Sequence, residues 1–188
     1  MNTSVALEEI EGVKAIKAKR IPDNRGSFTK FFQVDEYRSM SSSLNIDSLA
    51  FSENTSSGTL RGLHFQVPPH EEEKLVLCLK GRIFDVIVDL RPDSSTVGRW
   101  TSIELDANDP TTLILPKGIA HGFQTLTPNA KVLYGIGGEY VPMSGRSLLY
   151  SDLALEISWP LPVSQISTKD KNGILLAEAI SLHGPERR

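Results

Sequence analysis

Short runs of apolar and β-branched residues, broken by clusters of Gly, Pro, Asn and Asp, constrain the fold of this 188-residue chain most strongly. Runs of this length and spacing are typical of strands in a sandwich or barrel. Two short helical segments are also expected, and Gly173 weakens the second. The strand runs include Phe28–Val34, Lys74–Leu79, Arg82–Leu90, Trp100–Leu105, Thr111–Leu115, Gly122–Leu126 and Lys131–Ile136, and the helical segments are Asp35–Ser41 and Ser167–Glu178.

One turn in this pattern is especially compact. Lys80-Gly81-Arg82 joins two apolar runs, and Gly81 can adopt a positive φ that its neighbours would resist. We expect the strands on either side of it to pair antiparallel. The chain has no internal repeat or linker, and 39% hydrophobic residues suffice for one core, so residues 1–188 are expected to form a single domain.

The overall charge and hydropathy exclude some partners. A formal net charge of -3 provides no basic field for a nucleic-acid backbone, although a local basic pocket for a small anion is left open. No stretch approaches the roughly 20 apolar residues that cross a bilayer, which predicts a cytoplasmic protein without a membrane partner. The single cysteine, Cys78, lies in an apolar run and is expected to be buried and inert.

The densest group of reactive side chains lies in Arg61-Gly62-Leu63-His64-Phe65-Gln66 and, shortly after it, Lys74. A histidine can move protons near neutral pH, a lysine can stabilise an oxyanion, and an arginine binds phosphate oxygens. Together they fit proton abstraction next to a carbonyl of a phosphorylated substrate. Taken alone, His64 fits equally well a histidine bonded to a backbone carbonyl, and Lys74 fits better a solvated lysine at a strand start.

Two later positions are further candidates. The turn Pro116-Lys117-Gly118 delivers His121 to the start of a strand. Alternation along the strand places Tyr134 on the same face as its apolar neighbours Val132 and Ile136. That placement favours core packing, but a phenol that faces a pocket can also donate a proton.

These segments, in this order, resemble the dTDP-4-dehydrorhamnose 3,5-epimerase family, whose members act on nucleotide 4-keto-6-deoxy sugars. The resemblance runs from about Ile21 to Glu178. It implies a mainly β fold, a cupin-type antiparallel β-sandwich or jelly roll, and an epimerase that inverts C3 and C5 without a cofactor. The segments that carry it are Asp23–Phe28, Leu60–Gln66, Lys74–Val76, Gly81, Phe84–Arg91, Pro116–Phe123 and Ile157–Pro160.

The resemblance also implies roles for four catalytic residues at matching positions. His64 is implied to be the base that removes the proton α to the C4 ketone, and Asp170 the carboxylate that orients it. Tyr134 is implied to be the acid that returns a proton on the opposite face, and Lys74 to stabilise the enolate oxygen.

A nucleotide-diphosphate sugar and a second copy of the chain are the implied partners. In the family, the segment that corresponds to Arg25 reaches across a strand-exchanged dimer, so a homodimer is implied. The implied substrate-binding residues are Arg61 and Arg25 at the diphosphate, Phe28 and Tyr140 near the nucleotide or sugar, and Asn54 and His121 lining the pocket.

A metal site has to be weighed, because many cupins hold a metal through two histidines spaced by one residue, a glutamate and a later histidine. Here the segment reads His64-Phe65-Gln66, so a site with three histidines would need His70 as well as His121. We therefore expect no metal.

Several positions depart from the family pattern in segments that are expected to touch the substrate. Gly135, Lys30, Ser52, Gly145 and Tyr150 stand where the family commonly has lysine, glutamate, glutamine, glutamate and tryptophan. The nucleotide, the sugar and the number of inverted carbons are therefore left open. The alternatives are a mono-epimerase, an epimerase for another nucleotide sugar, a non-catalytic cupin that binds sugar nucleotides, and a metal-dependent cupin.

Overall fold

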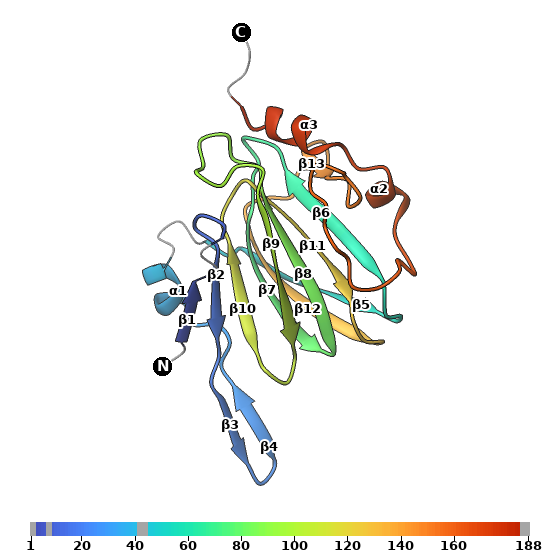
Figure 1. The fold of residues 1–188 in the computed structure, drawn as a ribbon. Coiled ribbons are helices and arrows are strands. Elements are labelled where there is room, and N and C mark those ends of the chain that lie inside the picture. The colour runs from blue at the N-terminus through green and yellow to red at the C-terminus, as the bar shows by residue number, and fades with distance from the viewer. Residues whose placement is uncertain (1–2, 7–8, 41–44, 185–188) are drawn as a thin grey trace.

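Two antiparallel sheets face each other in the computed structural model of the chain, which describes residues 3–6, 9–40 and 45–184 (Figure 1). The mainly β sandwich predicted from the sequence is thereby confirmed. The six-stranded sheet has the order β1 (Thr3–Ala6), β2 (Lys14–Lys17), β10 (Thr111–Leu115), β7 (Glu73–Lys80), β12 (Ala130–Gly137) and β5 (Ser48–Asn54). The five-stranded sheet has the order β13 (Gly145–Ser147), β6 (Leu60–Gln66), β11 (Ile119–Thr125), β8 (Arg82–Asp89) and β9 (Trp100–Asp106).

The main core lies between the sheets, because the alternating apolar side chains of both sheets meet there. Val76 and Val132 of the six-stranded sheet pack in one cluster with Ile83, Ile87 and Phe123 of the five-stranded sheet. All five are almost completely buried. Each aliphatic side chain of this kind contributes about 1.5–3 kcal/mol through burial.

The C-terminal segment covers the outer face of the five-stranded sheet, near β6 (Figure 1). It carries α2 (Thr168–Lys171) and α3 (Leu176–Ser181). Leu176 and Ala179 of α3 pack against Val86 and Val88 of β8. This second apolar cluster holds the segment in place and thereby positions α2 beside β6.

The prediction that the strands flanking Gly81 pair with each other is wrong. β7 pairs with β10 and β12, whereas β8 pairs with β11 and β9, so the two strands belong to different sheets. Gly81 has the predicted positive φ of 74°, but its turn carries the chain from one sheet to the other. Arg82 N donates to Thr127 Oγ1 at 3.0 Å, which fixes this corner against another loop. A hairpin and a corner between sheets share the same local signature.

Two other elements differ from the expected ranges. The run Phe28–Val34 is a strand only as far as Thr29, in the β4 (Gly26–Thr29) half of a separate hairpin with β3 (Arg20–Asp23). The segment Ser167–Glu178 splits into α2 and α3 at Gly173, where a Cβ would lie 2.7 Å from backbone atoms of the 148–149 segment.

The first predicted helix is confirmed as α1 (Val34–Met40), and the predicted end at Ser41 lies outside the described residues. None of the helices in the described part of the chain is long and apolar enough to cross a membrane.

Candidate active site

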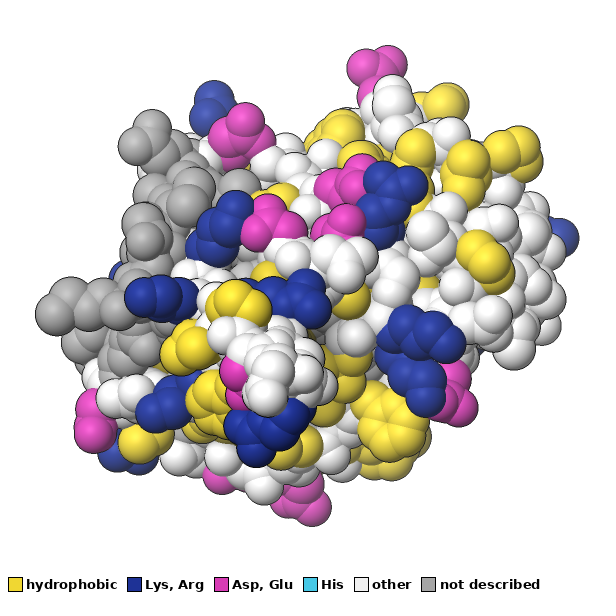
Figure 2. Space-filling view, turned by 90° about the horizontal axis from the view of Figure 1, so that it is seen from below, with side chains coloured by type: hydrophobic (Ala, Val, Ile, Leu, Met, Phe, Trp, Pro, Cys, Tyr) yellow, Lys and Arg dark blue, Asp and Glu magenta, His cyan; other side chains and the backbone are white. Residues whose placement is uncertain are grey.

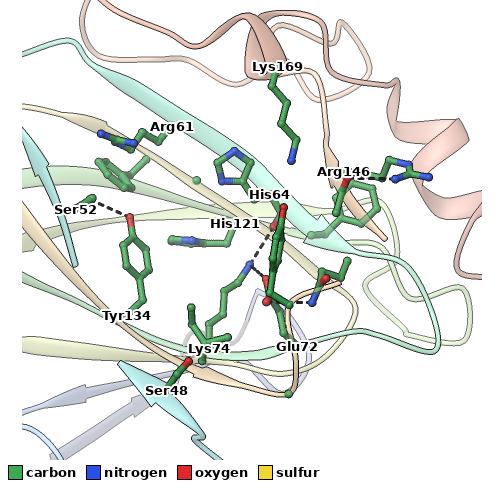
Figure 3. Close-up of a pocket in the computed structure, with 18 residues that line it drawn as sticks. Ser48, Ser52, Arg61, His64, Glu72, Lys74, His121, Tyr134, Arg146 and Lys169 are labelled. Atoms are coloured by element: carbon green, nitrogen blue, oxygen red, sulfur yellow. Dashed lines mark hydrogen bonds and ion pairs between the residues drawn. The ribbon is translucent and has the colours of Figure 1, made fainter. Parts of the chain in front are cut away.

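A cavity of about 420 Å³ is lined by strands of both sheets (Figure 3). The five-stranded sheet supplies Arg61, His64 and His121, and the six-stranded sheet supplies Lys74 and Tyr134. With Tyr140, the structure thus brings together six of the residues predicted from the sequence. The remaining lining residues are Ser48, Ser52, Phe65, Gln66, Glu72, Gly122, Phe123, Ile136, Gly138, Tyr140, Gly145, Arg146 and Lys169.

His64 is paired with Asp170, 106 positions later in the chain. The distance from His64 Nε2 to Asp170 Oδ1 is 2.6 Å, and Ser147 Oγ donates to the same oxygen at 2.9 Å. Asp170 lies on α2, and its backbone N–H donates to the N-cap hydroxyl of Ser167. Burial opposes ionisation, but the hydrogen bond and charge of His64, with the bond from Ser147, lower the pKa of Asp170 to about 2.

This pairing leaves His64 suited to proton transfer. Its side chain is 44% exposed and faces the cavity, whereas that of Asp170 is 5% exposed. Within the described part of the chain, no hydrogen bond occupies His64 Nδ1. A carboxylate bonded to Nε2 holds the ring orientation and tautomer, so Nδ1 is the nitrogen that can take a proton from a molecule in the cavity.

The interpretation of Lys74 as a solvated lysine is wrong. Its side chain is only 9% exposed, and Nζ lies 2.8 Å from Glu72 Oε1 and 3.3 Å from the backbone oxygen of His64. Glu72 supplies the counter-charge that makes burial of the ammonium tolerable. Because Lys74 points into the cavity beside His64 (Figure 3), its ammonium can face a developing oxyanion.

Tyr134 enters the cavity from β12, on the sheet opposite His64. Its hydroxyl lies 3.3 Å from Ser52 Oγ on the neighbouring strand β5. Burial raises the pKa of Tyr134 to about 12, so the phenol holds its proton at neutral pH. The phenol is therefore in the form that can act as an acid.

His121 belongs to a second pair of histidine and carboxylate. Its Nε2 lies 2.9 Å from Asp85 Oδ2, and the side chains are 4% and 0% exposed. Burial raises the pKa of Asp85, and the charge and hydrogen bond of His121 partly offset the effect. The His121 ring also meets the Tyr134 ring edge to face, with centroids 6.4 Å apart. His121 therefore forms part of the cavity wall next to Tyr134.

The predicted binding residues are only partly brought together. Arg61 lines the cavity, and its Nε donates to Asn54 Oδ1 at 2.7 Å, so the buried Asn54 supports Arg61 from behind. Tyr140 is 61% exposed and lines the cavity. Arg25 and Phe28 lie on the β3–β4 hairpin, which extends away from the sandwich (Figure 1), and neither lines the cavity.

Sequence reasoning missed several polar residues of this site. Asp85 was detectable, because alternation places it on the same inward face as Ile83 and Ile87 of the core. Glu72 stands among three consecutive glutamates, and nothing local distinguishes it. Arg146 and Lys169 also line the cavity, and a Cβ on Gly145 would lie 3.7 Å from Lys169 Nζ.

The chain is similar to known sugar epimerases over almost its whole length. Residues 8–178 match the family model described as dTDP-4-dehydrorhamnose 3,5-epimerase. The dTDP-4-dehydrorhamnose 3,5-epimerase of Shigella flexneri is 35% identical over 177 residues, which cover 94% of this chain and 97% of the relative. The dTDP-4-dehydrorhamnose 3-epimerase of Streptomyces niveus is 34% identical over 90% of this chain and 82% of its own length.

A solved structure agrees in fold as well. The dTDP-6-deoxy-D-glucose-3,5-epimerase of Legionella pneumophila, in complex with dTDP-4-keto-L-rhamnose, superposes with a TM-score of 0.88 at 35% identity, covering 95% of this chain and 97% of that one. Since the family model spans most of the chain and a relative above 30% identity is covered nearly end to end, the chain is an isomerase that belongs to the dTDP-4-dehydrorhamnose 3,5-epimerase family.

Proposed function

We propose that this enzyme inverts C3 and C5 of dTDP-4-dehydro-6-deoxyglucose, or of a closely related nucleotide sugar, by successive deprotonation and reprotonation. The observation that carries the proposal is the placement of His64 and Tyr134 on opposite sheets of one cavity. A sugar ring held between the sheets would present one face to the imidazole and the other to the phenol. Inversion at carbon requires this opposition of base and acid.

The chain's residues can account for each proton. His64 Nδ1 takes the proton from the carbon next to the C4 ketone, and the electron pair moves into the carbonyl to form an enolate. The ammonium of Lys74 faces the enolate oxygen, and Tyr134 returns a proton to the opposite face of the carbon. The tyrosinate and the imidazolium then exchange protons with solvent before the second carbon reacts, and again before the next turnover. The ketone itself acidifies C3 and C5, so the proposed chemistry needs no cofactor.

The nucleotide end of the substrate is proposed to lie toward Arg61 and Tyr140. The Arg61 guanidinium is held by Asn54 and can bind the diphosphate through its planar donors. Tyr140 is exposed beside Lys169 and Gly145 and can stack on a base. His121 is proposed to line the sugar-binding part of the cavity next to Tyr134.

We propose a homodimer in which Arg25 and Phe28 reach the cavity of the partner copy. The edge strand β5 exposes Leu49 at 70% and Phe51 at 63%, and the hairpin exposes Phe28 at 62%. An exposed apolar edge strand favours pairing with another chain. Figure 2, seen from the hairpin side, shows apolar side chains interspersed with Lys and Arg on this face.

Deuterium incorporation tests the catalytic proposal. The enzyme is incubated with dTDP-4-dehydro-6-deoxyglucose in D2O, and proton NMR follows C3 and C5 separately. We expect exchange at both carbons, loss of both in His64→Ala, and no change in His70→Ala, which removes an exposed histidine outside the cavity. Full exchange in His64→Ala would refute the assignment of the base.

The same spectra decide between the two candidate reactions. The similarity to the Streptomyces niveus 3-epimerase favours a mono-epimerase as the second candidate. Exchange confined to C3 would establish that reaction. No exchange at either carbon would direct the search to sugars on other nucleotides.

Light scattering during gel filtration tests the homodimer. We expect a mass of about twice 20.7 kDa, and a shift toward the monomer in Phe51→Lys. Leu153→Lys is the matched control, because Leu153 is 88% exposed on the C-terminal segment. A monomeric wild-type protein would contradict the proposal.

A further inference from the structure

Ser52 connects the proposed acid to the proposed diphosphate ligand. Its Oγ lies 3.3 Å from Tyr134 Oη and 3.4 Å from Asn54 Nδ2. Asn54 in turn accepts a hydrogen bond from Arg61 Nε at 2.7 Å. Four side chains therefore form one continuous row of hydrogen bonds along the cavity wall, and Figure 3 shows its Ser52–Tyr134 end.

Strand register places Ser52 at this junction. In the antiparallel pair of β5 and β12, Ser52 stands opposite Val132 and Asn54 opposite Ala130. Tyr134 is two residues beyond Val132 on the same face of β12, so Ser52 and Tyr134 are diagonal neighbours. This contact follows from the pairing of the strands and needs no loop to hold it.

The directions of the hydrogen bonds are fixed from Arg61 through Asn54 to Ser52. Arginine can only donate, so the amide atom of Asn54 that faces Arg61 has to be the oxygen. The amide nitrogen of Asn54 then faces Ser52 and the carbonyl of Ala130, and it donates to both. The 3.3 Å contact between Ser52 Oγ and Tyr134 Oη allows either hydroxyl to donate. Because the Asn54 nitrogen accepts no hydrogen bond, the Ser52 hydrogen is available to Tyr134 Oη, and a bond in that direction leaves the phenolic proton free to enter the cavity.

We propose that Ser52 is a positioning residue that donates to Tyr134 Oη, directs the phenolic proton toward the substrate and stabilises the tyrosinate left after proton transfer. This inference rests on the proposed role of Tyr134 as the acid. Burial disfavours the tyrosinate, and the hydrogen bond from Ser52 acts in the opposite direction. Arg61, a residue proposed to bind the substrate, fixes the orientation of the Asn54 amide. In this proposal that orientation directs the Ser52 hydroxyl hydrogen toward Tyr134.

A double-mutant cycle of Ser52→Ala and Tyr134→Phe tests the role of Ser52. Two rates are measured in D2O: formation of the inverted product, and deuterium entry into recovered substrate. We expect Ser52→Ala to slow inversion about tenfold to a hundredfold, as for a lost bond to a charged group, with KM and substrate exchange changed less than about twofold. In the Tyr134→Phe background, Ser52→Ala should have no further effect on either rate.

Three further variants sharpen the test. Ser52→Thr keeps a hydroxyl and should restore most of the inversion rate. Asn54→Asp replaces the donor with an oxygen that accepts the Ser52 hydrogen, so it should impair inversion as Ser52→Ala does. Ser102→Ala removes a strand serine of β9 outside the cavity and should match wild type.

The outcomes separate this inference from the proposed function. Absence of exchange in the wild-type protein, both on dTDP-4-dehydro-6-deoxyglucose and on related sugars of other nucleotides, would overturn the proposed function itself. An active wild-type protein with Ser52→Ala at the wild-type inversion rate would overturn only the role of Ser52. An additional loss caused by Ser52→Ala in the Tyr134→Phe background would do the same, because Ser52 would then act through another group.

Discussion

His64 and His121 stand directly opposite each other on the adjacent strands β6 and β11, and each imidazole Nε2 is bonded to its own buried carboxylate. The two pairs differ in environment. The His64 side chain is 44% exposed and its partner Asp170 has a lowered pKa, whereas His121 is buried and its partner Asp85 has a raised pKa. His64 can therefore exchange protons with a molecule in the cavity, while His121 is held as part of the wall.

Replacing Asp170 with asparagine should disable His64 without removing it. The amide keeps the size of the side chain but supplies no negative charge, and it can hold the ring in either tautomer. We expect inversion to slow on the order of 10²- to 10⁴-fold, the range of general acid–base catalysis. Initial rates of product formation, with Asp93→Asn as a control outside the cavity that His64 lines, measure the effect. A rate within threefold of wild type would remove Asp170 from the mechanism.

The lowered pKa of Asp170 also predicts how stability depends on pH. The folded state holds the carboxylate with a pKa of about 2, below the ordinary value of 3.8, so ionisation favours folding. This contribution, about 1–2 kcal/mol after allowance for solvent screening, is fully present above about pH 4 and is lost as pH falls toward 2. Urea unfolding of wild type and Asp170→Asn should therefore differ at pH 5 and converge near pH 2. A difference that stays constant over this range would contradict the assignment.

His121→Ala should destabilise the fold, because it leaves the carboxylate of Asp85 buried without its partner. Breaking a buried pair in this way typically costs about 3–5 kcal/mol. Since burial raises the pKa of Asp85, protonation relieves the cost, and the loss should be smaller at pH 5 than at pH 8. The double variant Asp85→Asn/His121→Ala carries no buried charge and should recover part of the stability. Urea midpoints at the two pH values provide the comparison.

The sequence predicted the features that depend on nearby residues and missed those that depend on residues far apart in the chain. The central residues of β7, β8, β9, β10 and β12 were predicted correctly from the apolar runs and the turn residues between them, because these signals depend on only a few neighbouring positions. The sheet that each strand joins depends on distant partners, so the turn at Gly81 was misread as a hairpin.

The site shows the same division. The His64–Asp170 contact spans 106 positions, and only the family resemblance indicated it before the structure did. The burial of Lys74 depends on Glu72, whose importance no local pattern reveals. Ser52 was noticed as a departure from the family, but its contact with Tyr134 depends on the pairing of β5 with β12.

Cys78 should resist alkylation in the folded protein. The thiol is buried in the core and bonded to the backbone oxygens of Lys80 and Gly81. Burial raises its pKa to about 11, so at pH 8 only about one molecule in a thousand carries the reactive thiolate. Incubation with iodoacetamide at pH 8, followed by mass spectrometry, should leave the native protein unmodified, whereas protein in urea should react fully. Rapid labelling of the native protein would contradict the buried placement predicted from the sequence.

Gly122→Ala should damage both stability and activity, because β6 and β11 approach too closely at this point for any side chain. A Cβ on Gly122 would lie 2.5 Å from the backbone oxygen of Arg61 and 3.0 Å from Gly62 Cα. The pairing of the two strands shifts register here, between His121 and Phe123. The clash can be relieved only if the backbone that carries Arg61 or His121 moves. The substitution should therefore displace side chains that line the cavity.

Overpacking of this kind costs about 1–3 kcal/mol, and no positive φ at Gly122 adds to it. Gly184→Ala is the matched control, since its Cβ would meet Ser181 O at an ordinary 3.4 Å. We expect a lowered urea midpoint and a raised KM for Gly122→Ala, and wild-type values for Gly184→Ala. Unchanged stability in Gly122→Ala would mean that β6 and β11 separate easily. The conclusion that these strands hold His64 and His121 at a fixed spacing would then be wrong.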